Sequence, residues 1–275
     1  MSAHPRPGRR GLRSSAAVAI ALLALIFGVT APAYAAKPTT PVVEKYVSLG
    51  DSYAAGQGAS DSLDSCQHTA AAYPVLLDAA PGINLLRTPA CSGATIADVT
   101  ATQLSQVNRG TTLVTLTVGA NDVGAGAIYT TCSVAPTSDA CEAALDSAQE
   151  ALNSGLIGQD LFALIRAIAE RAPNARIIVT DYPLPFKLPS NEWIPNYVDG
   201  ATAILNDQIA GAVAAAAEWA TNVELASVAD DFVGHQVGNA DPWLGANPAD
   251  PITFLHPTAA GQAAYRDAIL WALAN

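Results

Sequence analysis

Tyr46-Val47-Ser48-Leu49-Gly50-Asp51-Ser52-Tyr53 is an apolar run that stops at a small, turn-prone Gly-Asp-Ser sequence. The pattern predicts a buried strand that delivers the hydroxyl of Ser52 to the edge of a sheet. A serine on the turn after such a strand is held by rigid backbone and stays open to a ligand, as a nucleophile requires. Gly, Asp and Ser also end many strands as ordinary turn residues, so the rest of the chain must decide between the two interpretations.

Outward from this stretch, short apolar runs alternate with helical segments. Strands are expected at residues 46–49, 83–86, 113–118, 176–179 and 223–226. Helices are expected at about residues 71–79, 96–104, 143–171, 198–221 and 258–273. Continuous hydrophobic strands separated by helices predict an α/β fold whose parallel sheet is covered on both faces.

Three small or polar segments follow the strands of this predicted sheet. Ser52 follows the first strand, Cys91-Ser92-Gly93 closes the connection after the second, and Gly119-Ala120-Asn121-Asp122 follows the third. In open α/β sheets, ligands bind outside the carboxyl ends of the strands. All three segments are therefore expected at one edge of the sheet, which favours a functional Ser52 over a plain turn.

A serine hydroxyl becomes a good nucleophile only when a base takes its proton. After residue 35 the chain contains His68, His235 and His256. His256 precedes Pro257, which fits the first position of the final helix, so its imidazole is expected in a loop at a helix entrance. We choose His256 as the base and expect a structural role for His235.

These residues together resemble a known enzyme family. Gly50-Asp51-Ser52, Gly93, Gly119-x-Asn121-Asp122 and His256-Pro257 are similar to the four blocks of the SGNH (GDSL) hydrolase family, in the family's order. The resemblance covers most of the chain after residue 35 and is strongest to secreted bacterial lipases and esterases. It implies a flavodoxin-like three-layer α/β/α sandwich with a five-stranded parallel sheet, and hydrolysis of carboxylic esters.

Carried over residue by residue, the resemblance assigns a role to each block. Ser52 would be the nucleophile and His256 the general acid and base. The oxyanion hole would consist of the backbone N–H groups of Ser52 and Gly93 and the side-chain amide of Asn121, which stabilise the negative oxygen of the tetrahedral intermediate. This chemistry needs no cofactor and no metal.

One position departs from the family pattern. Many members have an aspartate three residues before the histidine, where this chain has Thr253. Either a main-chain carbonyl of residues 253–254 orients the imidazole, giving a Ser-His dyad, or a carboxylate such as Asp250 or Asp241 reaches it. We favour the dyad and keep Asp250 as the possible third member of a triad.

The N-terminus has the pattern of a signal peptide. Arg9, Arg10 and Arg13 precede an apolar run over residues 16–29, and Ala33-Tyr34-Ala35 fits a cleavage site. The run is shorter than the roughly 20 residues of a membrane-spanning helix, although an uncleaved anchor is the alternative. We expect a signal peptide over residues 1–35, a secreted protein, and one hydrolase domain over residues 36–275 without stable membrane insertion.

The charge and the cysteine content restrict the partners, disulfides and metal sites that this protein can have. Removal of residues 1–35 takes away four arginines and no acids, so 9 basic residues face 24 acidic ones. A nucleic-acid partner is therefore not expected, and we expect a monomer that acts on a small-molecule or lipid ester. Export permits disulfides, and proximity in sequence favours Cys132–Cys141 and leaves Cys66–Cys91 among the three possible pairings. Zinc-binding spacings such as C-x-x-C and H-E-x-x-H are missing from the sequence.

The segment 181–197 is rich in proline and aromatic residues and follows the fourth strand. It is expected to overhang Ser52 and to line an apolar acyl pocket, with Trp243 and Leu244 as the other wall. An esterase or lipase acting on acyl esters is the favoured function. A carbohydrate esterase that removes acetyl or feruloyl groups and a non-catalytic extracellular binding module are the alternatives.

Overall fold

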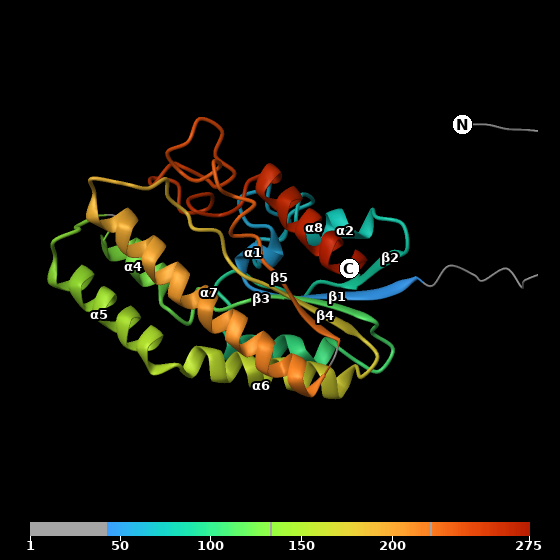
Figure 1. Cartoon of the computed structure of the whole chain (residues 1–275). Helices are drawn as coiled ribbons and strands as arrows, with labels where there is room; N and C mark the ends of the chain where they lie inside the picture. The colour runs from blue at the N-terminus through green and yellow to red at the C-terminus, as the bar shows by residue number, and fades with distance from the viewer. Residues whose placement is uncertain (1–42, 133, 221) are drawn as a thin grey trace, which may run out of the picture. The chain divides into compact units, whose positions relative to one another are not determined.

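The computed structural model describes residues 43–132, 134–220 and 222–275 of the 275-residue chain. Within these residues one sheet of five parallel strands forms the centre of the molecule (Figure 1). The strands are β1 (Glu44–Gly50), β2 (Ile83–Arg87), β3 (Leu113–Thr117), β4 (Arg176–Thr180) and β5 (Val223–Ala226). Their order in the sheet is β2-β1-β3-β4-β5, which is the flavodoxin-like order. The expected signal peptide lies outside the described residues.

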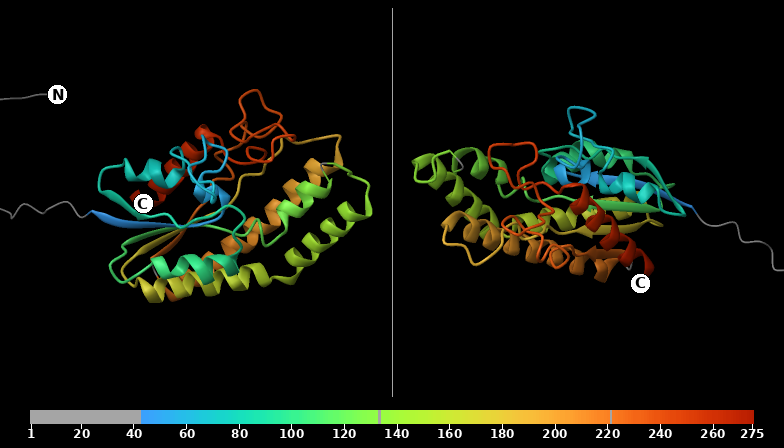
Figure 2. Two further views of the ribbon diagram at one scale, coloured as in Figure 1. Left: turned by 180° about the vertical axis from the view of Figure 1, so that it is seen from behind. Right: turned by 90° about the horizontal axis from the view of Figure 1, so that it is seen from above.

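Helices pack on both faces of the sheet. They are α1 (Ser52–Ala55), α2 (Tyr73–Asp78), α3 (Ile96–Asp98), α4 (Ala125–Cys132), α5 (Asp139–Ser154), α6 (Leu156–Arg171), α7 (Trp193–Trp219) and α8 (Ala259–Ala274). A π-helical turn, η1 (Val99–Gln103), and a 3-10 turn, η2 (Leu104–Gln106), extend α3. Helices α2 and α8 lie on one side of the sheet, and α5, α6 and α7 lie on the other (Figure 1), which the further views also show (Figure 2).

Two hydrophobic cores follow from the alternation of side chains along each strand. Tyr46 of β1 packs in the core with Tyr73 of α2 and Tyr265 of α8. Its neighbour Val47 points to the opposite face, into the core that contains Leu161 of α6. Both faces of the sheet are thus covered by apolar helix surfaces, which confirms the predicted α/β/α sandwich.

The predicted strands agree with the observed ones, but two helical predictions need correction and one helix was not predicted. The single helix expected over residues 143–171 is two helices, because Gly155 adopts a left-handed conformation (φ 69°) between them. Helix α7 begins at Trp193, inside the segment that was expected to be a loop. Pro195 does not prevent this, because it lies in the first turn, where a missing N–H costs no hydrogen bond. Helix α4 was not expected. In the part of the chain described, no helix is long and apolar enough to cross a bilayer.

The strand order reverses between β1 and β3, which are neighbours in the sheet. The connection after β1 crosses to β2 on one side, and the chain then returns to β3 on the other. Loops that leave the carboxyl ends of β1 and β3 therefore diverge and leave a crevice between them, the usual ligand position in such folds. Ser52 and Asn121 follow these two strands.

Candidate active site

Ser52 and His256 lie side by side at this crevice, although 204 residues separate them in sequence. The Ser52 hydroxyl oxygen is 3.0 Å from Nε2 of His256. Ser52 is 8% exposed and lines a cleft together with His256. This distance is within hydrogen-bonding range, so the imidazole can take the hydroxyl proton.

Ser52 is the first residue of α1, and Asp51 holds it there. The Asp51 carboxylate caps the helix by accepting from the Tyr53 N–H (2.9 Å), and it accepts a second hydrogen bond from the Tyr182 hydroxyl (2.5 Å). Burial raises the pKa of Asp51 to about 7. The Tyr182 hydroxyl in turn accepts from the Ala120 N–H at 3.3 Å, so the turn after β1 is tied to the loop after β3.

His256 lies in the loop before α8, as the sequence predicts, but Pro257 does not occupy the first helical position, because Thr258 is the N-cap and the helix begins at Ala259. The main-chain N–H of His256 donates to the Thr253 carbonyl at 2.9 Å. The Thr258 side chain caps α8 by accepting from the Gly261 N–H. Burial lowers the pKa of His256 to about 4, and a main-chain hydrogen bond at Phe254 acts in the opposite direction. The imidazole is therefore neutral near pH 7, the state in which it can accept a proton.

Gly93 and Asn121 also line the cleft with Ser52. Gly93 has a φ of +82°, and a Cβ at this position would have no heavy atom within 4 Å outside its chain neighbours. Glycine is favoured here by its backbone conformation, and it leaves the main chain open to the cleft. The Asn121 amide donates to the Ala94 carbonyl at 3.0 Å, which connects it to the Gly93 loop. The amide nitrogen carries a second N–H, so it has the capacity for one more hydrogen bond.

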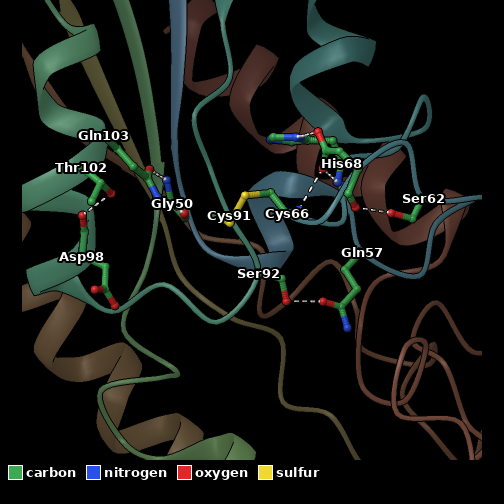
Figure 3. The surroundings of a disulfide bond; sticks show 11 residues. Gly50, Gln57, Ser62, Cys66, His68, Cys91, Ser92, Asp98, Thr102 and Gln103 are labelled. Atoms are coloured by element: carbon green, nitrogen blue, oxygen red, sulfur yellow. Dashed lines mark hydrogen bonds and ion pairs between the residues drawn. A yellow bond between two sulfur atoms is a disulfide. The ribbon is translucent and has the colours of Figure 1, made fainter.

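The Gly93 loop is anchored at several points. A disulfide joins Cys66 to Cys91, the Cys91 N–H donates to the Gly50 carbonyl (3.0 Å), and the Ser92 hydroxyl donates to Oε1 of Gln57 (Figure 3). The second disulfide joins Cys132 at the end of α4 to Cys141 in α5. Both pairs are those expected from the sequence. Export of such a protein to an oxidising compartment would preserve them.

Among the residues that the structure describes, neither candidate aspartate forms a hydrogen bond or ion pair with His256. The Asp250 carboxylate accepts from the Ile252 N–H (3.0 Å) and the Thr253 hydroxyl (2.7 Å). The main-chain carbonyl of Asp241 lies 2.8 Å from Nδ1 of His235, whose ring stacks on Trp243. Asp241 therefore belongs to the surroundings of a different histidine.

The cleft adjoins an apolar cavity of about 350 Å³. The two share eight lining residues, among them Ala125, Leu205 and Phe254. The cavity walls come from α4, from the first half of α7 and from the loop before His256. Glu192 is the charged residue among those that line it.

The walls of this cavity differ from those expected for an acyl pocket. Phe186 and Tyr197 line it as predicted, but Trp243 lines a separate hollow against α8, and Leu244 is buried in the core. Residues of α4 such as Ile128 form the opposite wall instead. The sequence Gly124-Ala125-Gly126-Ala127 gave little sign of a helix, since glycine is a poor helix former.

Comparison with known proteins agrees with the geometry. The model of the GDSL-like lipase/acylhydrolase family matches residues 48–264. A lipase from Streptomyces rimosus is 35% identical over 271 residues, which cover 94% of this chain and 95% of the lipase. The crystal structure of the extracellular lipase from Streptomyces rimosus superposes with a TM-score of 0.75 at 32% identity, covering 84% of this chain and 100% of that one. Phospholipase A1 from Streptomyces albidoflavus gives a TM-score of 0.75 at 31% identity, covering 84% and 99%.

A serine hydroxyl within hydrogen-bonding reach of a histidine is a pair that serine hydrolases share on unrelated folds. The chain belongs to the GDSL-like lipase/acylhydrolase family, and it is a carboxylic ester hydrolase.

Proposed function

We propose that this protein is a secreted esterase or lipase that cleaves acyl esters through an acyl-enzyme on Ser52. The observation that carries the proposal is the 3.0 Å contact between the Ser52 hydroxyl and Nε2 of a neutral His256. His256 takes the hydroxyl proton as Ser52 attacks the ester carbonyl, and then gives it to the leaving alcohol. It next activates the water that releases the acid.

The negative oxygen of each tetrahedral intermediate lies among three donors in this proposal. They are the backbone N–H groups of Ser52 and Gly93 and the side-chain amide of Asn121, all of which belong to residues that line the same cleft. Because hydrogen bonds and the disulfide already fix these loops, the donors need little reorganisation during the reaction.

A Ser-His dyad accounts best for the surroundings of the imidazole. A carbonyl that accepts from a ring N–H stabilises the imidazolium and raises its pKa, which is the direction of the Phe254 contribution. With Nε2 facing Ser52, Nδ1–H would donate to the Phe254 carbonyl and keep the ring in the tautomer that a base requires. Asp250 then only stabilises the turn before His256.

The change Asp250→Asn tests this assignment. We expect kcat to change by no more than about threefold, whereas loss of a triad aspartate costs on the order of 10⁴. The measurement is turnover of p-nitrophenyl butyrate by both proteins. A loss of about 10⁴ with an unchanged melting temperature would make Asp250 the third catalytic residue.

The apolar cavity favours an acyl chain over a sugar as the group next to the ester carbonyl. Sugar hydroxyls need polar partners, and the residues that line the cavity offer few. An acyl chain gains up to about 0.8 kcal/mol for each buried CH₂, or roughly fourfold in binding. The proposed substrates are therefore lipid-like esters and not acetylated polysaccharides.

We expect kcat/KM to rise from p-nitrophenyl acetate to p-nitrophenyl octanoate, with little release of acetate from acetylated xylan. In the variant Ile128→Trp, which fills the cavity, octanoate turnover should fall by about tenfold or more and acetate turnover should change little. The matched control is Ile204→Trp, at an exposed position of α7 that does not line the cavity. An equal loss on both esters would contradict an acyl site here.

Secretion as a single domain over residues 36–275 is part of the proposal. The similarity to a lipase described as extracellular and the N-terminal pattern of residues 1–35 support it. N-terminal sequencing of material from the culture medium should begin at Ala36. A start at Met1 or Ser2 would contradict cleavage.

The proposed enzyme works as a monomer without a cofactor or a nucleic-acid partner. The acidic net charge supports the last of these, since it repels a polyanion at long range.

A further inference from the structure

Gln57 is a buried polar side chain that the mechanism above does not use. It follows α1, and its main-chain N–H donates to the Ser52 carbonyl at 3.0 Å. It is 5% exposed and lines the same cleft as Ser52 and His256. A buried amide needs partners for both of its polar atoms.

The side-chain amide of Gln57 joins two loops that are distant in sequence. Nε2 donates to the Ile252 carbonyl at 2.9 Å, in the loop before His256. Oε1 accepts from the hydroxyl of Ser92, the residue before Gly93 (Figure 3). These partners fix the orientation of the amide, because the reversed amide would set its oxygen against the Ile252 carbonyl.

The same amide also lies against the imidazole. Nε2 of Gln57 is 3.4 Å from Nδ1 of His256, which is a packing contact and not a hydrogen bond in the tautomer proposed above, because both nitrogens carry hydrogens. The next turn residue, Gly58, packs on the same loop, and a Cβ there would be 3.1 Å from the Thr253 Cα and 3.2 Å from the His256 Cβ. The turn after α1 and the His256 loop are therefore in direct contact.

We infer that Gln57 is a positioning residue that holds the His256 loop and the Gly93 loop at a fixed separation across Ser52. The inference rests on the proposed function of those three residues. The base and one oxyanion donor come from different loops, and both must face the same reacting carbonyl. A displacement of about 1 Å in such a geometry can cost on the order of 10² in rate.

The test is Gln57→Met, which keeps the length of the side chain and removes its amide. We expect kcat on p-nitrophenyl butyrate to fall by about 10- to 100-fold, while KM changes by less than about twofold. Rates are expressed per active site, counted by complete labelling with a fluorophosphonate. This normalisation separates positioning from a smaller folded fraction.

Gln208→Met is the matched control. Gln208 bridges helices in the same way, since Nε2 donates to the Leu152 carbonyl (2.7 Å) and Oε1 accepts from the Gly158 N–H (3.1 Å). It does not line the cleft. Its loss should lower the melting temperature and leave kcat per labelled site unchanged.

Ser92→Ala removes the other end of the bridge. The effects of Gln57→Met and Ser92→Ala on kcat should be non-additive, with the double variant close to the more damaged single variant. Additive losses, or wild-type kcat per site in Gln57→Met, would overturn the inference. Should Gln57→Met not fold, Ser92→Ala alone decides: a fall in kcat of about fivefold or more supports the bridge, and unchanged kcat overturns it.

A different result would contradict the proposed function. If Ser52→Ala keeps turnover, the assignment of the nucleophile is wrong. If Ser52→Ala is inactive and Gln57→Met is fully active, only the positioning role of Gln57 is wrong.

Discussion

Ser52→Ala is expected to lower kcat on p-nitrophenyl butyrate by roughly 10⁵- to 10⁶-fold, because the acyl-enzyme of the proposed mechanism forms on Ser52. In the proposed mechanism Ser52 and His256, whose side chains are 3.0 Å apart, act as one unit. His256→Ala should therefore lose a similar factor, and the double variant should lose no more than the worse single variant. End-point assays of p-nitrophenol release over several hours with purified proteins would measure these rates.

A serine that lies outside the cleft is the matched control for this result. Ser62 is exposed, and its hydroxyl donates to the Asp64 carbonyl (2.8 Å) in a surface loop. Ser62→Ala should keep wild-type kcat. Residual activity of a few per cent in Ser52→Ala, after contamination is excluded with a second preparation, would contradict Ser52 as the nucleophile.

Asn121→Ala has the second largest expected effect. The Asn121 amide already donates to the Ala94 carbonyl at 3.0 Å, so its position is set before the substrate arrives. Removal of one oxyanion donor should lower kcat by about 10²- to 10³-fold. KM should change little, since the oxyanion exists in the transition state and not in the ground state.

The split between kcat and KM separates this role from a structural one. If Asn121 only supports the Gly93 loop through Ala94, its loss would lower the melting temperature and disturb KM together with kcat. Steady-state kinetics and thermal unfolding of the same preparation would distinguish the two. Wild-type turnover in Asn121→Ala would remove Asn121 from the oxyanion hole.

Much of this arrangement could be predicted from the sequence because it depends on local patterns. The runs at residues 113–118 and 176–179 are continuous and apolar, as strands buried on both faces must be, and the structure contains both. The segments after β1 and β3 fall at one sheet edge for topological reasons alone. Ser52 and Asn121 therefore could be placed without coordinates.

Other features depend on tertiary contacts that leave no local signal. The partners of Gln57 lie 35 and 195 residues away, and a single glutamine between two glycines looks like an ordinary turn residue. Helix α4 has a weak sequence pattern, and its packing against the apolar cavity appears only in three dimensions. Trp243 was expected as a wall of the pocket, but it lies in a separate hollow against α8, where it stacks on His235.

The most direct test of the account is to treat the purified protein with a fluorophosphonate and to map the adduct by mass spectrometry. We expect one adduct per molecule, on Ser52, that forms together with loss of esterase activity and is missing in Ser52→Ala. An adduct on another residue, or full activity with Ser52 unlabelled, would contradict it.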